Sequence, residues 1–288
     1  MKSRFSVIGR LGTGVSAAVL GMAVAGQALA DTLGQPTPGG IGLQPAGSEI
    51  RREAMFFHND ILLPIITFIA LFVLALLIIV ILRFNKRANP TPARWSHNTP
   101  IEILWTVTPV LILMVIAIFS FRLLFKEHDM PAPYATVKVT ARQWNWDYEY
   151  PDLKVPAYTS TLMDHKTADA QHVPYLLATT APLVAPVGKV IRVQVTGEDV
   201  IHSFSVPAFG IKIDAVPGRL NQTWFKAEKV GTYYGQCSQL CGVDHAFMPI
   251  EVKVVSQADF DAWVASKAPK AAPARAAAPA APAAPAAA

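Results

Sequence analysis

Two long apolar runs dominate the pattern of hydrophobic and polar positions in the first half of the chain. Residues 61–82 contain no charged side chain, and a second uncharged run, 103–121, is prolonged to about residue 124 by one arginine and two leucines. As helices rising about 1.5 Å per residue, runs of roughly 20 residues span the ~30 Å hydrocarbon core of a bilayer. The pattern therefore predicts a transmembrane helical hairpin over residues 60–125, with spans at 61–82 and 103–124, rather than two buried helices of a soluble protein.

After residue 131 the hydrophobic pattern changes to a period of two, which is typical of half-buried strands. Alternating or β-rich segments occur at residues 136–140, 144–150, 189–196, 222–225, 231–234 and 249–255. Pro-Gly and Gly turn signals separate several of them, and a helical pattern follows at 257–266. The pattern predicts an antiparallel β-sandwich or barrel over residues 126–266, in which residues 152–186 form a long loop or hairpin across the sandwich.

The composition of the two ends of the chain differs from that of the middle. Residues 1–30 combine three basic residues and no acid with an apolar run and a final Ala-Leu-Ala, which is typical of a secretory signal peptide. The alternative is an uncleaved first membrane anchor. Residues 31–59 then form a segment outside the cytoplasm, and residues 267–288, almost entirely Ala and Pro, are expected to be disordered.

The distribution of charge predicts how the hairpin is oriented. The loop at 83–100 carries four Lys or Arg residues and no acid, so the positive-inside rule places it in the cytoplasm and both ends of the chain on the outer side of the membrane. The whole chain has a net charge of +5, but residues 126–266 contain 15 acids and 12 Lys or Arg residues, a balance of −3. Such a module does not fit a nucleic-acid-binding protein. We expect a membrane-anchored protein whose folded domain is all-β.

Glu102 lies at the predicted cytoplasmic start of the second span. A carboxylate there either stabilises the N-terminus of the helix, where Asn98 or Thr99 can cap and Pro100 suits the first turn, or it serves a proton or ion pathway. The residues alone leave both interpretations open.

The only two cysteines of the chain, Cys237 and Cys241, share one loop with His245 and Met248. Two thiolates, an imidazole and a thioether select copper over hard cations, and His202, which follows a strand and a turn, is the best candidate for a second imidazole. The alternative is a disulfide, which exported proteins with an even number of cysteines usually form. The neighbouring His and Met favour the metal. Because two thiolates with three residues between them can bridge two metals, we expect a dinuclear centre that transfers electrons.

At this point the chain resembles a known family. The hairpin and the motif Cys-Ser-x-x-Cys-Gly-x-x-His-x-x-Met-Pro resemble subunit II of bacterial haem-copper cytochrome c oxidase, over about residues 50–265. The segments at 143–150, 198–204 and 214–219 also look like that family, in the same order. The resemblance implies a cupredoxin-like Greek-key domain on the periplasmic side of a bacterial inner membrane, with both ends of the chain in the periplasm. It also implies a dinuclear copper A centre with the ligands His202, Cys237, Cys241, His245, Met248 and the backbone carbonyl of Gln239.

Gln239 departs from the family's pattern, which usually has Glu at this position. In the family that carboxylate also binds a magnesium ion shared with subunit I. The carbonyl ligand to copper survives the change, whereas a neutral amide oxygen lacks the charge that hard cations favour.

The resemblance further implies that electrons from cytochrome c enter at Trp144. The alternative is that Trp144 packs in the core of the sandwich, which is how we interpret Trp146. Docking of cytochrome c is implied at Gln143, Glu149, Glu198 and Asp199. The acidic balance of the module suits electrostatic steering of a basic partner. The Ile-Glu-x-x-Trp pattern around Glu102 resembles the cytoplasmic mouth of a proton path into subunit I, and this favours the proton role.

The expected function is therefore that of the electron-accepting subunit of an oxidase. Electrons would pass to haem in subunit I, which also holds copper B, and oxygen would be reduced to water there with proton pumping. A quinol oxidase subunit II would lack the copper ligands, and a nitrous oxide reductase would need a large additional domain. A copper-delivery or storage protein would need neither Trp144 nor Glu102.

Overall fold

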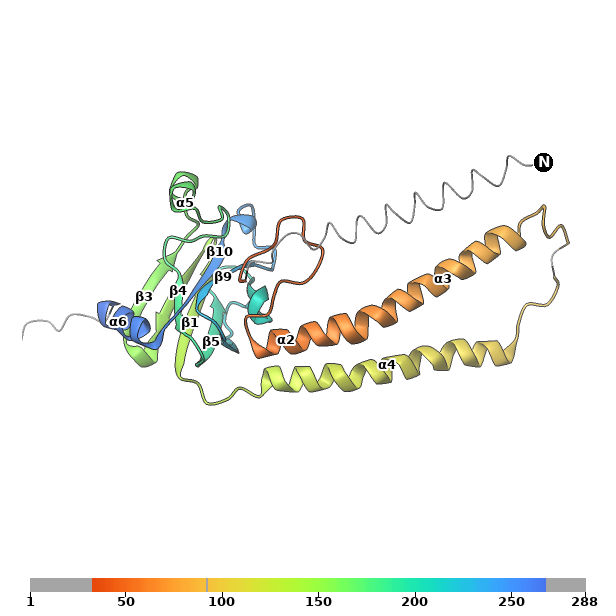
Figure 1. Cartoon of the computed structure of the whole chain (residues 1–288), viewed down its shortest axis with the longest axis horizontal. Helices are drawn as coiled ribbons and strands as arrows, with labels where there is room; N and C mark the ends of the chain where they lie inside the picture. The colour runs from red at the N-terminus through yellow and green to blue at the C-terminus, as the bar shows by residue number, and fades with distance from the viewer. Residues whose placement is uncertain (1–32, 92, 268–288) are drawn as a thin grey trace, which may run out of the picture.

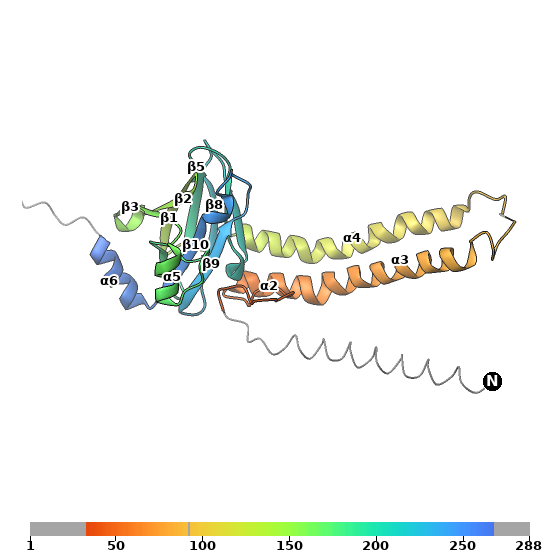
Figure 2. The same cartoon turned by 90° about the horizontal axis from the view of Figure 1, so that it is seen from above.

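The computed structural model describes residues 33–91 and 93–267 (Figure 1). The signal peptide predicted at 1–30 and residues 268–288 of the predicted tail lie outside the described residues. Two long helices project side by side from a β domain, and the loop that joins them lies at the end remote from that domain (Figures 1 and 2).

The first long helix consists of three consecutive parts: α2 (Glu49–Phe56), a π-helical segment (Phe57–Leu62) and α3 (Leu63–Arg83). The second is α4 (Thr99–His128). Both are long and apolar enough to cross a membrane, and the apolar side chains of α3 and α4 are mostly exposed, as expected for surfaces that meet lipid or other membrane helices. The predicted pair of apolar helices is confirmed, and each extends beyond its uncharged run because charged residues continue the helix at both ends.

Local sequence explains where these helices begin. The Ser48 side chain accepts a hydrogen bond from the backbone N–H of Arg51 at 3.1 Å and caps α2. The Asn98 side chain caps α4 in the same way through the N–H of Ile101 at 3.3 Å, and Pro100 occupies the first turn. The caps satisfy N–H groups that have no partner within the helix.

The β domain is a sandwich of two five-stranded sheets. The first sheet has the order β3-β2-β1-β5-β8, formed by β1 (Ala135–Arg142), β2 (Asn145–Tyr150), β3 (Val155–Ser160), β5 (Val190–Gly197) and β8 (Asn221–Lys226). The second has the order β4-β10-β9-β6-β7, formed by β4 (Leu183–Pro186), β6 (His202–Val206), β7 (Ile211–Ala215), β9 (Gly231–Cys237) and β10 (Pro249–Val255). The described part of the domain is completed by α5 (His165–Gln171), α6 (Gln257–Lys267) and short 3₁₀ turns at Pro151–Leu153, Pro207–Phe209 and His245–Phe247.

The prediction of a purely antiparallel sandwich is wrong in two places. β1 pairs with β5 in parallel, and β4 pairs with β10 in parallel. Alternation of side chains indicates which face of a strand is buried, but not the direction of the neighbouring strand. Residues 152–186 are also more structured than a loop laid across the sandwich, because they contain β3 and β4 at the outer edges of the two sheets and α5 between them.

The core lies between the two sheets. On β2 the aromatic residues Trp146, Tyr148 and Tyr150 are fully buried, and on β5 every second residue from Ile191 to Val195 is buried. Trp146 is therefore a core aromatic, as expected. Its ring meets Phe204 of the opposite sheet edge-on, with ring centroids 5.5 Å apart.

Candidate metal centre

Pairing of strands in the second sheet brings the predicted metal ligands together. Cys237 is the last residue of β9 and pairs with Phe204 of β6, and His202 is the first residue of the same strand β6. The chain then turns through residues 238–248 into β10, which also pairs with β9. The upstream histidine and the cysteine loop therefore meet at one end of the sheet, although 35 residues separate His202 from Cys237.

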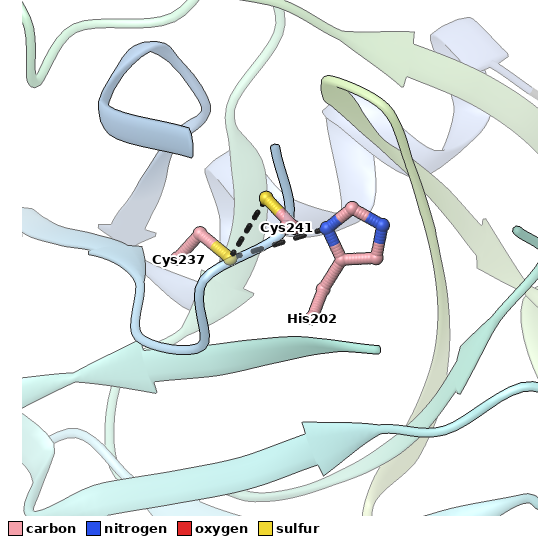
Figure 3. Close-up of side chains that lie close together, drawn as sticks. All are labelled: His202, Cys237 and Cys241. Atoms are coloured by element: carbon pink, nitrogen blue, oxygen red, sulfur yellow. Dashed lines mark hydrogen bonds between the residues drawn. The ribbon is translucent and has the colours of Figure 1, made fainter. Parts of the chain in front are cut away.

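The donor atoms converge on a small volume (Figure 3). The two Sγ atoms are 3.9 Å apart, and the Nδ1 atom of His202 is 4.0 Å from the Sγ atom of Cys237. The Sγ atom of Cys241 lies 3.5 Å from the Nδ1 atom of His245 and 3.5 Å from the Sδ atom of Met248. The carbonyl oxygen of Gln239 lies 3.4 Å from the Sγ atom of Cys237. All six predicted donors are thus assembled around the two sulfur atoms.

This arrangement fits a metal better than a disulfide. A disulfide has an S–S distance of about 2.05 Å, whereas the cysteines are free and their sulfur atoms are 3.9 Å apart. The donor atoms of His202, Cys237 and Cys241 all lie within 4.8 Å of one another. These three residues and Met248 are buried, so a bound ion would be shielded from water. Sulfur and imidazole donors suit copper, and the residues present therefore fit that metal.

Asp199 holds the imidazole of His202 in place. Its Oδ1 atom lies 2.9 Å from the Nε2 atom of His202, which leaves Nδ1 to face the sulfur atoms. Its carboxylate also accepts hydrogen bonds from the backbone N–H groups of Gln143, at 2.7 Å, and Val200, at 2.6 Å. Although burial acts in the opposite direction, these hydrogen bonds hold the pKa of Asp199 below its ordinary value. A carboxylate that fixes the second nitrogen of a ligand histidine is common at metal sites.

The two thiols have different electrostatic surroundings. Burial acts to raise the pKa of Cys237, but the contact with His202 and neighbouring backbone groups lower it to about 6. Burial, with the negative charge of the Cys237 sulfur beside it, raises the pKa of Cys241 to about 12. The surroundings therefore favour the thiolate form of Cys237 and the protonated form of Cys241, and binding a metal through both sulfurs requires Cys241 to release its proton.

The turn between β1 and β2 covers the cysteine loop. The Nε2 atom of Gln143 donates to the carbonyl oxygen of Cys241 at 2.8 Å, and the Nε1 atom of Trp144 lies 3.3 Å from the same oxygen. A Cβ atom on Gly242 would lie 2.9 Å from the Trp144 ring, so only glycine lets the indole pack this closely. Trp144 is partly buried, and its indole is in direct contact with the backbone of a ligand residue.

Sequence reasoning missed the contacts made by Gln143 and Gly242. Gln143 was predicted only as a docking residue, and its residue type gave no indication that its amide would contact the Cys241 carbonyl. The glycine that directly follows Cys241 was a usable signal, since a close backbone approach often requires glycine.

The acids predicted to dock a partner all have partners within the chain. The Glu149 carboxylate lies 3.8 Å from the Nζ atom of Lys138, and Glu198 forms an ion pair with Arg142. Asp199 contacts His202 as described. Docking at Gln143 and at these acids stays a prediction.

Glu102 lies at the other end of the molecule, in the first turn of α4 (Figure 1). Its Oε1 atom accepts a hydrogen bond from the N–H of Asn98 at 3.3 Å, which is the capping contact of a helix N-terminus. The proton role of Glu102 stays a prediction, as does magnesium binding by the exposed Gln239 side chain.

Comparison with known proteins covers both parts of the chain. The family described as cytochrome c oxidase subunit II, transmembrane domain, matches residues 36–123, and the family described as cytochrome c oxidase subunit II, periplasmic domain, matches residues 135–255. Cytochrome c oxidase subunit 2 of Cereibacter sphaeroides is 44% identical over 258 residues, which cover 84% of this chain and 85% of that protein. A probable cytochrome c oxidase subunit 2 of Rickettsia bellii is 48% identical over 233 residues, covering 81% and 86%.

Among solved structures, the periplasmic domain of subunit II of cytochrome oxidase from Bradyrhizobium japonicum is 54% identical, with a TM-score of 0.45 and coverage of 48% of this chain and 96% of that chain. The two family matches together include the hairpin, the sandwich and every residue of the metal loop. The chain therefore belongs to the cytochrome c oxidase subunit II family, and its transmembrane-domain match and two apolar helices make it a membrane-anchored subunit.

Proposed function

We propose that this subunit accepts electrons from reduced cytochrome c at a dinuclear copper A centre and passes them to haem in subunit I. Oxygen would be reduced to water in subunit I, which also carries copper B, with proton pumping. The observation that carries the proposal is the convergence of two free thiols, two imidazoles, a thioether and a backbone carbonyl at one end of the second sheet. When bound, a dinuclear copper centre held by these residues would supply one-electron redox chemistry.

The protein's own residues supply the rigid surroundings that electron transfer requires. Cys237 is the last residue of β9, and Met248 directly precedes β10, which pairs with β9. The pairing of these strands fixes the backbone of both residues. Trp146 donates from Nε1 to the carbonyl oxygen of Met248 at 3.3 Å, and Asp199 fixes the ring of His202. Little has to move when charge at the site changes.

Trp144 is the proposed point at which electrons enter. Its ring is partly exposed, and its Nε1 atom contacts the carbonyl oxygen of Cys241, so it joins the surface to a ligand residue. The proposed partner surface around it includes Gln143, Glu149 and Glu198. In the membrane, the N- and C-termini of the mature protein would lie in the periplasm, with Glu102 at the cytoplasmic side as the start of a proton path. A magnesium ion at Gln239 would lie between this subunit and subunit I.

The full-length chain, purified in detergent and loaded with copper, tests the centre. We expect two copper ions per chain and an electron paramagnetic resonance spectrum whose hyperfine structure comes from one electron shared by two copper nuclei. Cys237→Ser should abolish that pattern, because the site would lose one of its two thiolate donors, whereas Ser238→Ala in the same loop should preserve it. A spectrum from a single copper nucleus in the unmutated chain, or a copper-free chain with linked cysteines, would contradict the proposal.

The role of Trp144 is tested by Trp144→Phe in the same copper-loaded chain. We expect reduction by cytochrome c to slow by at least about tenfold, while copper content and spectrum stay unchanged. Loss of the copper signal would instead assign Trp144 to holding the loop, through its contact with the Cys241 carbonyl. Stopped-flow absorbance measures the rate.

A further inference from the structure

A compact group of charges lies beside the Gln143–Trp144 turn. Arg142 is the last residue of β1, directly before that turn. Its guanidinium forms an ion pair with Glu198 through Nε, and its Nη2 atom lies 3.4 Å from the Oδ2 atom of Asp147 on β2. The side chains of Arg142 and Glu198 are 49% and 55% exposed, so both face a partner that approaches the turn.

Arg142 controls how much negative charge this surface presents. Asp147 and Glu198 together carry a charge of −2, and Arg142 reduces the charge of the group to −1. The third nearby acid, Asp199, already accepts hydrogen bonds from two backbone N–H groups and contacts His202, so it cannot turn toward a partner without releasing the metal ligand. The adjustable part of the charge is therefore the group of Arg142, Asp147 and Glu198.

A second ion pair on the same two strands provides a comparison. Lys138 of β1 lies 3.8 Å from Glu149, its direct neighbour on β2. Lys138 precedes Arg142 by four residues, which is about 13 Å along a strand. It carries the same charge but lies farther from the turn at which electrons are proposed to enter.

We propose that Arg142 is an internal counterion that limits the docking of a basic electron donor at Trp144 and so sets the salt dependence of that encounter. The inference rests on the proposed function. Exposed ion pairs contribute little to stability, so a lysine of the donor can replace Arg142 as the partner of Glu198 at small cost. Removing Arg142 leaves the exposed Glu198 carboxylate available to the donor before contact, and the charge of Asp147, whose side chain is 15% exposed and accepts a hydrogen bond from Thr159 Oγ1 at 2.6 Å, is no longer neutralised.

The test measures the second-order rate of reduction of the copper-loaded full-length chain by a basic cytochrome c as ionic strength is varied. Arg142→Gln should raise the rate about two- to fourfold at 0.01 M salt, where charges act over ~30 Å, and the difference should vanish near 1 M, where they act over ~3 Å. Lys138→Gln should give a smaller increase, although it changes net charge equally. The double variant Arg142→Gln/Glu198→Gln restores the charge of the group and should return the rate toward that of the unmutated chain.

The copper spectrum of each variant shows whether the centre is intact. Equal rates for the unmutated chain and Arg142→Gln at every salt concentration, or equal effects of Arg142→Gln and Lys138→Gln, would overturn the inference while leaving the proposed function in place. A slower Arg142→Gln variant would overturn it too, since the arginine would then be needed to hold the carboxylates in position. If cytochrome c fails to reduce the unmutated, copper-loaded chain, the proposed function itself fails and the inference falls with it.

Discussion

Asp199 joins the surface of the domain to the interior of the metal centre. One oxygen of its carboxylate contacts the imidazole of His202, and the other accepts the N–H of Gln143 at the start of the covering turn. The sequence places Asp199 three residues before the candidate ligand His202. It does not reveal that the Asp199 side chain points toward the His202 imidazole. One carboxylate thus orients a ligand and holds the turn that carries Trp144.

Asp199→Asn tests this orienting role, because the amide keeps the shape of the side chain and removes its charge. We expect copper affinity to fall by about tenfold, since changes to groups that orient a ligand histidine cost about 10- to 100-fold. Competition with a copper chelator measures the affinity. Glu198→Gln is the matched control, because the neighbouring residue loses the same charge but contacts Arg142 rather than His202. Equal copper affinities for the two variants would show that net charge, not orientation, matters.

At the scale of elements, two strands with regular alternation of burial were predicted from the sequence. β2 and β5 alternate buried and half-buried residues along their length, and both were predicted. β4 has four buried residues in a row, and β3 is buried only at its ends, so neither shows a period of two. The candidate metal ligands within one loop could be proposed from their spacing, whereas their proximity to His202 depends on the pairing of β6 with β9, which no local pattern encodes.

Gly235 makes that pairing possible. It lies on β9 two residues before Cys237, and a Cβ atom added there would lie 2.0 Å from the backbone carbonyl oxygen of Ser205 on β6. Because a strand backbone cannot move aside as a side chain can, Gly235→Ala should destabilise the sandwich by about 3 kcal/mol, the upper end for overpacking, and weaken copper binding.

Thermal unfolding of the full-length chain in detergent measures this effect. Gly42→Ala is the control: a Cβ atom there would meet nothing within 4 Å, so stability should change by less than about 0.5 kcal/mol. If Gly235→Ala were as stable as Gly42→Ala, the close approach of β6 and β9 would not be needed for the fold.

At the scale of the whole molecule, the hairpin is attached to the sandwich through the start of α2 and the end of α4. Backbone hydrogen bonds join Gly47 to Ala208 and Glu228, and the Nε1 atom of Trp224 donates to the carbonyl oxygen of Glu127 at 3.0 Å. Exposed ion pairs lie around this joint, with Arg52 bound to Glu228 and Lys126 of α4 bound to Glu49 and Glu53 of α2. These contacts set the orientation of the metal centre relative to the two membrane helices.

The buried contact in this joint should matter more than the exposed ion pairs. Ser48 is 1% exposed, donates from Oγ to the carbonyl oxygen of Phe209 at 2.7 Å and caps α2. Ser48→Ala removes both interactions and leaves a buried carbonyl without its partner, which costs about 1–2 kcal/mol, whereas Arg52→Gln breaks an exposed ion pair that contributes about 0–1 kcal/mol. Local opening of the joint should therefore become about 5- to 30-fold more frequent in Ser48→Ala and less than about fivefold more frequent in Arg52→Gln. Hydrogen exchange at the Gly47 and Glu228 amides measures this opening. Faster exchange in Arg52→Gln than in Ser48→Ala would mean that the ion pairs, rather than the buried hydrogen bonds, hold the sandwich against the helical hairpin.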